Sequence, residues 1–414
     1  MGTFNGANIN KLNGGLGRGS NSSDRVIALI IGMTPTAQVV AKSVHEIYDI
    51  TTAESLGITA ATDNNNGELV HYHLDEMTRL KPGFTYLLIP VVKTTTIAQL
   101  VADDAIKAII RDKGVNVIGI AGIASATLDA IDADALALQA LVTAFATEKR
   151  LIDGVILEGV AKTAGANTFS SLVDVFDLVT LTAPNVSVCV LQDPTQAALN
   201  AAFAKHAAVG TVLGSVAVRK IHEDLGSVDV EDKPDAQKGK ETFSISDATL
   251  GRWASVALSD GTLLKSVSQA TQTALTGKGY IFAGSFENYA GVYLSGCPTA
   301  VGDESDYSAF NLNCIWNKAA RIIRTTLIPL VRSTVPKELD GSIQSTWITS
   351  AEDKVGKALK KGLIDTGNAT AYDIYINPDQ ITNKTTPLSV KAQVQVGDIV
   401  HEFNVDLGLT SKIA

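Results

Sequence analysis

The chain has 414 residues, of which 45% are hydrophobic, and its 43 Asp and Glu against 34 Lys and Arg give a formal net charge of −9. This length exceeds one ordinary core, so we expect two or three folded domains and no extensive disorder. The acidic balance argues against general nucleic-acid binding, and no apolar run approaches the ~18 residues of a membrane span, so neither nucleic acid nor membrane is an expected partner.

The cysteines and the start of the chain predict where the protein is made. Cys189, Cys297 and Cys314 have no spacing typical of a metal site or a disulfide framework, which is typical of buried thiols in a reducing compartment. The residues after Met1 contain no basic segment followed by an apolar run, so no signal peptide is predicted. We therefore expect assembly in a cytoplasm.

Residues 1–22 predict an arm that does not fold alone. They contain six glycines, and their apolar side chains are sparse: Phe4, Ile9, Leu12 and Leu16. The backbone entropy lost on ordering such a segment exceeds what these side chains gain by burial. A phosphate-binding loop at residues 15–19 is not favoured, because such a loop follows a strand and this one precedes the first strand.

Residues 23–300 alternate between buried strands and amphipathic helices. The predicted strands are short, β-branched and almost continuously apolar, and they cover residues 26–31, 84–92, 115–121, 152–157, 186–191 and 211–218. Thr96 and Asp193 are expected to cap helices, and a further helix is expected to bury Leu138, Leu141, Val142 and Phe145. The alternation predicts an α/β domain with a largely parallel sheet.

An α/β domain also raises the possibility of an enzyme, for which we find no motif. The sequence has no dinucleotide-binding or Walker phosphate-binding glycine motif and no GxSxG nucleophile motif. His71, His73 and Asp75 would share one face of a strand within reach of one metal ion, but a fourth ligand is not evident. We therefore predict no catalytic, cofactor-binding or metal site, and a nucleotide- or metal-dependent enzyme remains the distant alternative.

The later part of this domain contains one charged stretch and several short elements. Residues 222–241 mix both signs of charge with Gly and Pro, which predicts an exposed surface loop. A turn at Asp260 and Gly261, a helix over 269–275 and paired strands at 280–283 and 290–294 are expected to follow.

A long helix is predicted from residue 310 toward residue 335, ending before Pro336. Its apolar stripe consists of Leu312, Ile315, Trp316, Ala319, Ile322, Ile323 and Leu327. On another face, Lys318, Arg321 and Arg324 recur at steps of three. Between residues 307 and 361 nine basic side chains stand against four acidic ones, so this is a basic segment in an acidic protein. A solvated face is the usual explanation of such a stripe.

The last residues predict a second basic helix and a β-hairpin. The helix covers about 351–361, strands are expected at 372–376 and 388–396, and Gly397 with Asp398 fits a two-residue turn. The final strand alternates in hydrophobicity through Ile399, His401, Phe403, Val405 and Leu407. No later segment covers its edge, so we expect it to pair with another copy of the chain.

The succession of elements from Tyr293 to Lys361, together with Gly14-Gly15-Leu16-Gly17-Arg18, resembles contractile-tail sheath proteins, in particular the DUF2586-like subfamily of phage and prophage sheaths. The resemblance implies an N-terminal linking arm (1–22), an α/β domain (23–300) and a C-terminal α+β sheath core (301–414) that ends in a linking strand (399–409). It is strongest at the two ends of the chain. The sequence departs from the family pattern at Asn311 and Asn313, where basic residues are frequent.

The resemblance also implies a function and partners. Such a subunit forms six-fold discs that stack helically around an inner tail tube protein and contract to drive the tube through the target cell envelope. Baseplate and tail terminator proteins are the further partners, no cofactor is needed, and Lys318, Arg321 and Arg324 are expected to face the tube. The location implied is the virion tail, assembled in the cytoplasm of a host bacterium. A sheath from a non-phage contractile injection system or a tailocin remains the alternative.

Overall fold

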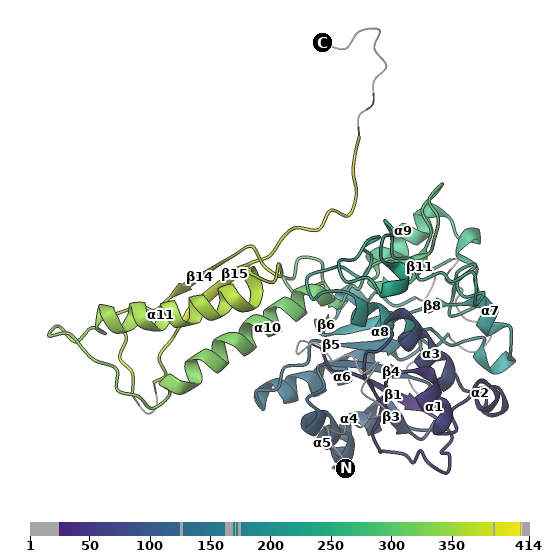
Figure 1. Ribbon diagram of the computed structural model, residues 1–414, viewed down its shortest axis with the longest axis horizontal. Helices are drawn as coiled ribbons and strands as arrows, with labels where there is room; N and C mark the ends of the chain where they lie inside the picture. The colour runs from purple at the N-terminus through teal and green to yellow at the C-terminus, as the bar shows by residue number, and fades with distance from the viewer. Residues whose placement is uncertain are drawn as a thin grey trace, which may run out of the picture. The chain divides into compact units, whose positions relative to one another are not determined.

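The structure is a computed structural model that describes residues 25–124, 127–161, 169, 171–172, 175–383, 386–405 and 407 (Figure 1). The predicted arm therefore lies outside the described residues, as do residues 406, 408 and 409 of the predicted linking strand. The chain divides into two compact units, one up to Asn317 and one from Lys318 onward. Residues 301–317, which we assigned to the C-terminal core, thus belong to the first unit.

The first unit is built on a seven-stranded sheet that is parallel except at one edge. In spatial order its strands are β10 (Tyr280–Ile281), β7 (Val186–Cys189), β5 (Gly154–Glu158), β4 (Val117–Ala121), β1 (Ile27–Gly32), β3 (Tyr86–Val91) and β2 (His45–Ile47). Only β2 runs antiparallel to its neighbour. The central strands are buried throughout, which explains their unbroken apolar sequences. The predicted α/β fold is confirmed.

Helices connect these strands and cover the sheet. They are α1 (Ile50–Ser55), α2 (Ala60–Asn66), α3 (Val70–Leu80), α4 (Ile97–Ala102), α5 (Asp104–Lys113), α6 (Ile131–Thr147), α7 (Pro194–Ala197), α8 (Val209–Val218) and α9 (Gln269–Gly277). Thr96 caps α4 by accepting from the Gln99 N–H, and Asp193 caps α7 ahead of Pro194, as predicted. The stripe on α6 is buried at all four predicted positions. Among the described residues, none of the helices is long and apolar enough to cross a membrane.

The prediction of a strand at 211–218 is wrong, because these residues belong to helix α8. All ten residues of α8 are buried, so the helix is apolar on every side and shows no 3.6-residue period. It packs beside α3 and across β1, β4 and β5. The two helices approach closely at Gly210, where an added Cβ would lie 2.4 Å from the His73 carbonyl oxygen. Glycine at this position therefore lets α8 pack directly against α3. A helix buried on every side has the same unbroken apolar sequence as a buried strand, which explains the wrong prediction for residues 211–218.

Three short antiparallel pairs complete the first unit: β6 (Thr182–Ala183) with β13 (Ala300–Val301), β8 (Leu191–Gln192) with β9 (Ala257–Leu258), and β11 (Ala283–Gly284) with β12 (Tyr293–Leu294). The expected pairing of 280–283 with 290–294 is thus limited to β11 and β12, because Tyr280 and Ile281 join the large sheet. In residues 222–241 the regular structure is one 3₁₀ turn, Asp235–Gln237, and ion pairs join charged side chains such as Lys238 and Asp235 at 2.6 Å.

The second unit contains the end of helix α10 (Phe310–Leu327), a 3₁₀ turn (Ile328–Leu330), helix α11 (Ser345–Leu359), a π-helical turn (Lys360–Ile364) and strands β14 (Ala371–Tyr375) and β15 (Lys391–Gln395). Helix α10 ends earlier than predicted, just ahead of Pro329, which cannot donate a helical hydrogen bond. One core cluster consists of Ala319, Val355, Leu359, Leu363 and Ala369. A second consists of Ile343, Ile348, Ala351 and Ile376.

The predicted two-residue hairpin at Gly397 and Asp398 does not form in the single chain. Strand β15 instead pairs antiparallel with β14, with Tyr372 opposite Val394. Residues 396–405 have no regular secondary structure. The alternating sequence of residues 399–407 meets the side-chain requirement of a strand, but a strand also needs a backbone partner, and in the described chain residues 396–405 pair with no other strand.

Candidate functional site

Doubly wound sheets bind ligands where the strand order reverses, at the carboxyl ends of two neighbouring strands. Here the reversal lies between β1 and β4, and it is closed by the backbone itself. Gly32 ends β1 and Gly122 follows β4, and a Cβ added to Gly32 would lie 1.9 Å from the Gly122 carbonyl oxygen. The backbone segments that follow β1 and β4 are therefore packed directly against each other at this point.

The carboxylate beside this crevice, that of Glu158, is hydrogen-bonded to groups of the same chain. Glu158, fully buried at the end of β5, accepts from the Gly122 N–H at 2.7 Å and the Ala207 N–H at 3.0 Å, and pairs with His206 Nδ1 at 2.9 Å. Burial alone would raise the pKa of Glu158, but the His206 charge and these hydrogen bonds outweigh it and lower the pKa. Burial would likewise lower the pKa of His206, and the Glu158 carboxylate raises it instead. The Glu158–His206 pair, here called the clasp, therefore has a structural role: it holds the segment at His206 against the end of β5.

This clasp predicts how stability depends on pH. The raised pKa of His206 means that its contribution is complete below the ordinary value of 6.5 and is lost as pH rises through the folded-state pKa. The lowered pKa of Glu158 means that its contribution is complete above 4.5 and is lost as pH falls through the folded-state pKa. His206→Gln should cost about 2 kcal/mol of unfolding free energy near pH 6. Urea unfolding from pH 5 to 9 measures this, and an unchanged slope above pH 6.5 in the variant would contradict it.

The histidines considered as metal ligands lie on helix α3, so the prediction that they alternate along a strand is wrong. Residues two apart on a helix point in nearly opposite directions. His71 Nε2 lies 3.3 Å from Glu54 Oε1, while buried His73 accepts the Gly210 N–H at Nδ1, at 3.1 Å. Burial lowers the pKa of His73 to about 4. No group of three or more possible ligands occurs among the described residues.

A second buried carboxylate, Glu76 on α3, also has a structural role, because its hydrogen bonds connect separate elements of the fold. It accepts from Arg79 at 2.9 and 2.8 Å, from Thr211 Oγ1 at 2.8 Å and from Trp253 Nε1 at 2.8 Å. Trp253 has a φ of +54°, which is unusual for a bulky residue, and its backbone N–H donates to Asp193 Oδ2. The carboxylate thus joins α3, α8 and the segment before β9.

The first half of α10 is anchored by asparagines that sequence reasoning assigned no role. Asn313 Nδ2 donates to the Pro184 carbonyl at 2.8 Å, and Asn317 Nδ2 donates to Asp153 Oδ1 at 2.9 Å. Both amides are buried, as is Asn311, so a basic side chain at position 311 or 313 would have to give up its water on burial. The departure from the family pattern therefore has a packing reason. The sequence signal that could have indicated this anchoring role is the four-residue spacing of Asn313 and Asn317, which places both on one face of an otherwise apolar helix.

The predicted tube-facing residues lie on the part of α10 that follows these anchors. Lys318 and Arg321 are half-buried, and Arg324 is exposed. Trp316, which we expected on the inward stripe, is instead 50% exposed and meets Tyr307 edge to face with ring centroids 6.0 Å apart.

The tail after β15 carries the second set of predicted residues. Phe403, Val405 and Leu407 are 81%, 74% and 90% exposed, and His401 and Ile399 are also exposed. Within the described part of the chain, β14 and β15 pair only with each other, so each has one open backbone edge. Apolar side chains beside unpaired edges are the groups that β-augmentation uses.

The family model described as DUF2586, N-terminal domain, matches residues 4–297. No curated protein matches the sequence. The family match spans the middle of the chain, which the sequence resemblance covered least.

Several solved structures share the fold. The helical sheath of the anti-feeding prophage (AFP) in its contracted state is 14% identical over 100% of both chains, with a TM-score of 0.59. The six-fold symmetrised AFP baseplate gives 13% identity over 99% of this chain and 100% of the other, with a TM-score of 0.58. A sheath complex of an extracellular contractile injection system, PVC, in its contracted state gives 13% identity over 100% and 99%, with a TM-score of 0.56. At these identities the likeness concerns the fold, whereas the family follows from the sequence match over most of the chain: the protein belongs to the DUF2586 family.

Proposed function

We propose that this protein is the structural subunit of a contractile sheath, which polymerises helically around an inner tube and contracts to drive the tube through a target cell envelope. The observation that carries the proposal is the similarity of the entire chain, in both units, to the contracted AFP sheath. A similarity confined to the α/β unit would fit many unrelated functions, since that architecture hosts many.

The ends of the chain supply the linking mechanism. The exposed tail, with Ile399, His401, Phe403, Val405 and Leu407, gains a backbone partner by adding to a sheet of a neighbouring copy. The arm, residues 1–22 with Phe4, Ile9, Leu12 and Leu16, does the same from the other end. Contacts of this head-to-tail kind do not close on themselves, so they generate a filament that stays linked while it contracts.

The partners and the location form the finer part of the proposal. Beyond six-fold discs of the same chain, they are an inner tube protein, baseplate proteins and a tail terminator, in a virion tail assembled in a bacterial host. The similar solved structures come from the anti-feeding prophage and an extracellular injection system, and the sheath of a non-phage contractile injection system or a tailocin is the alternative.

A sheath needs no chemical step, and this predicts a null result in two assays. The close backbone contact at Gly32 and Gly122, and the hydrogen bonds that Glu158 makes within its own chain, support this expectation. Purified protein should hydrolyse no nucleotide and contain no stoichiometric metal by elemental analysis. One zinc per chain, lost in His71→Ala or His73→Ala, would contradict this expectation and support a metal-dependent enzyme instead.

The basic stripe predicts a salt-sensitive contact with the tube. Reversing Lys318 and Arg324 to Glu should weaken co-sedimentation with the tube protein by on the order of tenfold, since each exposed ion pair contributes about 0.2–1 kcal/mol. The loss should diminish as salt screens the charges. Reversing Lys205 and Lys240, exposed lysines of the first unit, makes the same change in net charge and serves as the control. Unaltered co-sedimentation of the stripe variant would remove the stripe from the function.

A further inference from the structure

An exposed tryptophan stands on the part of helix α10 that belongs to the first unit. Trp316 is 50% exposed, although the residues on either side of it, Ile315 and Asn317, are buried. Asn317 donates to Asp153 Oδ1 at 2.9 Å, so the backbone that carries the indole ring is held in place. An exposed aromatic side chain on a fixed backbone loses little entropy on binding, which is typical of residues that dominate protein interfaces.

A turn with three carboxylates lies against this ring. Tyr307 meets Trp316 edge to face, and the turn just before Tyr307 contains the exposed side chains of Asp303, Glu304 and Asp306. Among the described residues, none of these three carboxylates forms an ion pair. The residues one helical turn away from Trp316 are uncharged: Leu312, Asn313, Ala319 and Ala320. The turn therefore gives the surface around the ring a negative charge that the described chain does not neutralise.

The arm, residues 1–22, has the opposite charge. It contains Lys11 and Arg18 and no Asp or Glu. Its leucines stand next to these cations in the sequence, Leu12 directly after Lys11 and Leu16 two residues before Arg18. A Lys or Arg side chain is attracted both by carboxylates and by the face of an indole ring, and leucine gains by covering that ring. The arm thus complements the surface at Trp316 in charge and in apolar groups.

The described chain begins close to the helix that carries this surface. Arg25 is buried and donates to two carbonyls of the segment 219–222, at 2.6 and 3.2 Å. Asn311, at the start of α10, donates to a third carbonyl of the same segment at 3.4 Å. Trp316 follows about 7.5 Å further along the helix axis, whereas residues 11–24 can span up to about 45 Å when extended. The arm can therefore reach the tryptophan of its own chain.

We propose that, before assembly, the arm binds the aromatic–acidic patch of its own chain, formed by Trp316, Tyr307 and residues 303–306. The cations of the arm pair with the carboxylates, and its leucines cover the indole ring. Because arm and patch belong to one chain, even weak contacts are sufficient to keep the arm bound. The bound arm is then withheld from free sheet edges until a neighbouring copy displaces it. This last consequence rests on the proposed sheath function, whereas the binding itself does not.

Acrylamide quenching of tryptophan fluorescence tests the binding in the full-length protein, at concentrations below those at which it polymerises. The chain has three tryptophans, and the signal lost in Trp316→Phe identifies the contribution of Trp316. Reversing Lys11 and Arg18 to Glu should raise the quenching constant of this contribution about twofold, and added salt should raise that of the original protein toward the same value. Reversing Lys205 and Lys240 makes the same change in net charge and should leave the constant unchanged.

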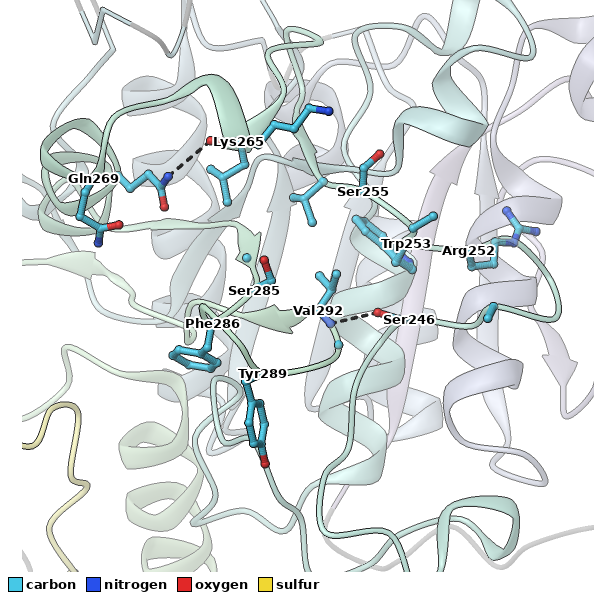
Figure 2. Close-up of a pocket in the computed structure, with 17 residues that line it drawn as sticks. Ser246, Arg252, Trp253, Ser255, Lys265, Gln269, Ser285, Phe286, Tyr289 and Val292 are labelled. Carbon is cyan, nitrogen blue, oxygen red and sulfur yellow. Dashed lines mark hydrogen bonds between the residues drawn. The ribbon is translucent and has the colours of Figure 1, made fainter.

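A charge exchange tests whether the patch is the partner of the arm. Asp303→Lys with Asp306→Lys should raise the quenching constant as the arm variant does, and joining the two variants in one chain should restore the original value. The matched control is Glu287→Lys, an exposed carboxylate beside another exposed aromatic residue of the same unit, Phe286, which lines a separate cavity (Figure 2). This change should have no effect on Trp316.

Two results would overturn the inference. Equal quenching of Trp316 in the original protein and in the arm variant would show that the arm does not cover the ring. Protection of Trp316 that increases with protein concentration would assign the patch to the arm of another copy. Failure of the proposed function looks different, because a protein that shows the predicted protection and never polymerises retains the bound arm and is not a sheath subunit.

Discussion

Deleting residues 396–414 should abolish assembly while the remaining protein stays folded. The deleted segment follows β15, its described side chains are largely exposed, and the hairpin partner of β15 is β14, which the deletion leaves intact. Helical content and thermal midpoint should therefore be nearly unchanged. Deleting residues 1–19, which lie outside the described residues, should have the same two effects. Circular dichroism and electron microscopy of the same preparations measure both.

A milder change separates backbone pairing from the mere presence of the tail. Val405→Pro removes one backbone donor and fixes φ, which breaks the ladder of a paired strand and is harmless in an unpaired tail. Val405→Thr keeps the backbone donor and is the matched control. Long, contractile tubes from the proline variant or from either truncation would show that the ends do not link the lattice, and lateral contacts between α/β units would then have to hold it together.

Gly210→Ala should destabilise the first unit by about 3 kcal/mol, at the upper end of overpacking effects. The added Cβ would lie 2.4, 2.6 and 2.8 Å from three backbone atoms of His73 on α3, and backbone cannot rotate aside as a side chain can. Helix propensity alone predicts the opposite sign, because alanine stabilises a helix interior over glycine by about 1 kcal/mol.

The matched control is Gly277→Ala in α9, where the added Cβ would meet nothing within 4 Å beyond its chain neighbours and the backbone of its own helix. This variant should be as stable as the original or slightly more stable. Urea unfolding of both variants measures the difference. Equal stability of the two alanine variants would mean that α3 and α8 are not packed as tightly as the structure has them.

Much of the α/β unit could be predicted from the sequence, because its strands and helix caps are local signals. Thr96 and Asp193 cap their helices through contacts with the next few residues, and the β-branched runs at β1 and β4 need only burial on both faces. Helix α8 could not be predicted this way, since a helix buried on all sides has lost the period by which helices are recognised.

The same distinction, between local sequence signals and contacts far apart in the sequence, applies to the candidate surfaces. The alternation in residues 399–407 indicated apolar side chains that need a partner, but it did not indicate that β15 would pair with β14, because pairing depends on contacts far apart in the sequence. The strand assumed for His71 and His73 failed because α3 is held by contacts with α8, more than 130 residues later.

The most direct test of the central claim is negative-stain electron microscopy of the purified, full-length protein across a range of concentrations. A contractile-sheath subunit should form rings or tubes of uniform diameter, with a hollow centre wide enough for an inner tube. A small, stable monomer at every concentration, especially one that retains a bound nucleotide, would contradict the account.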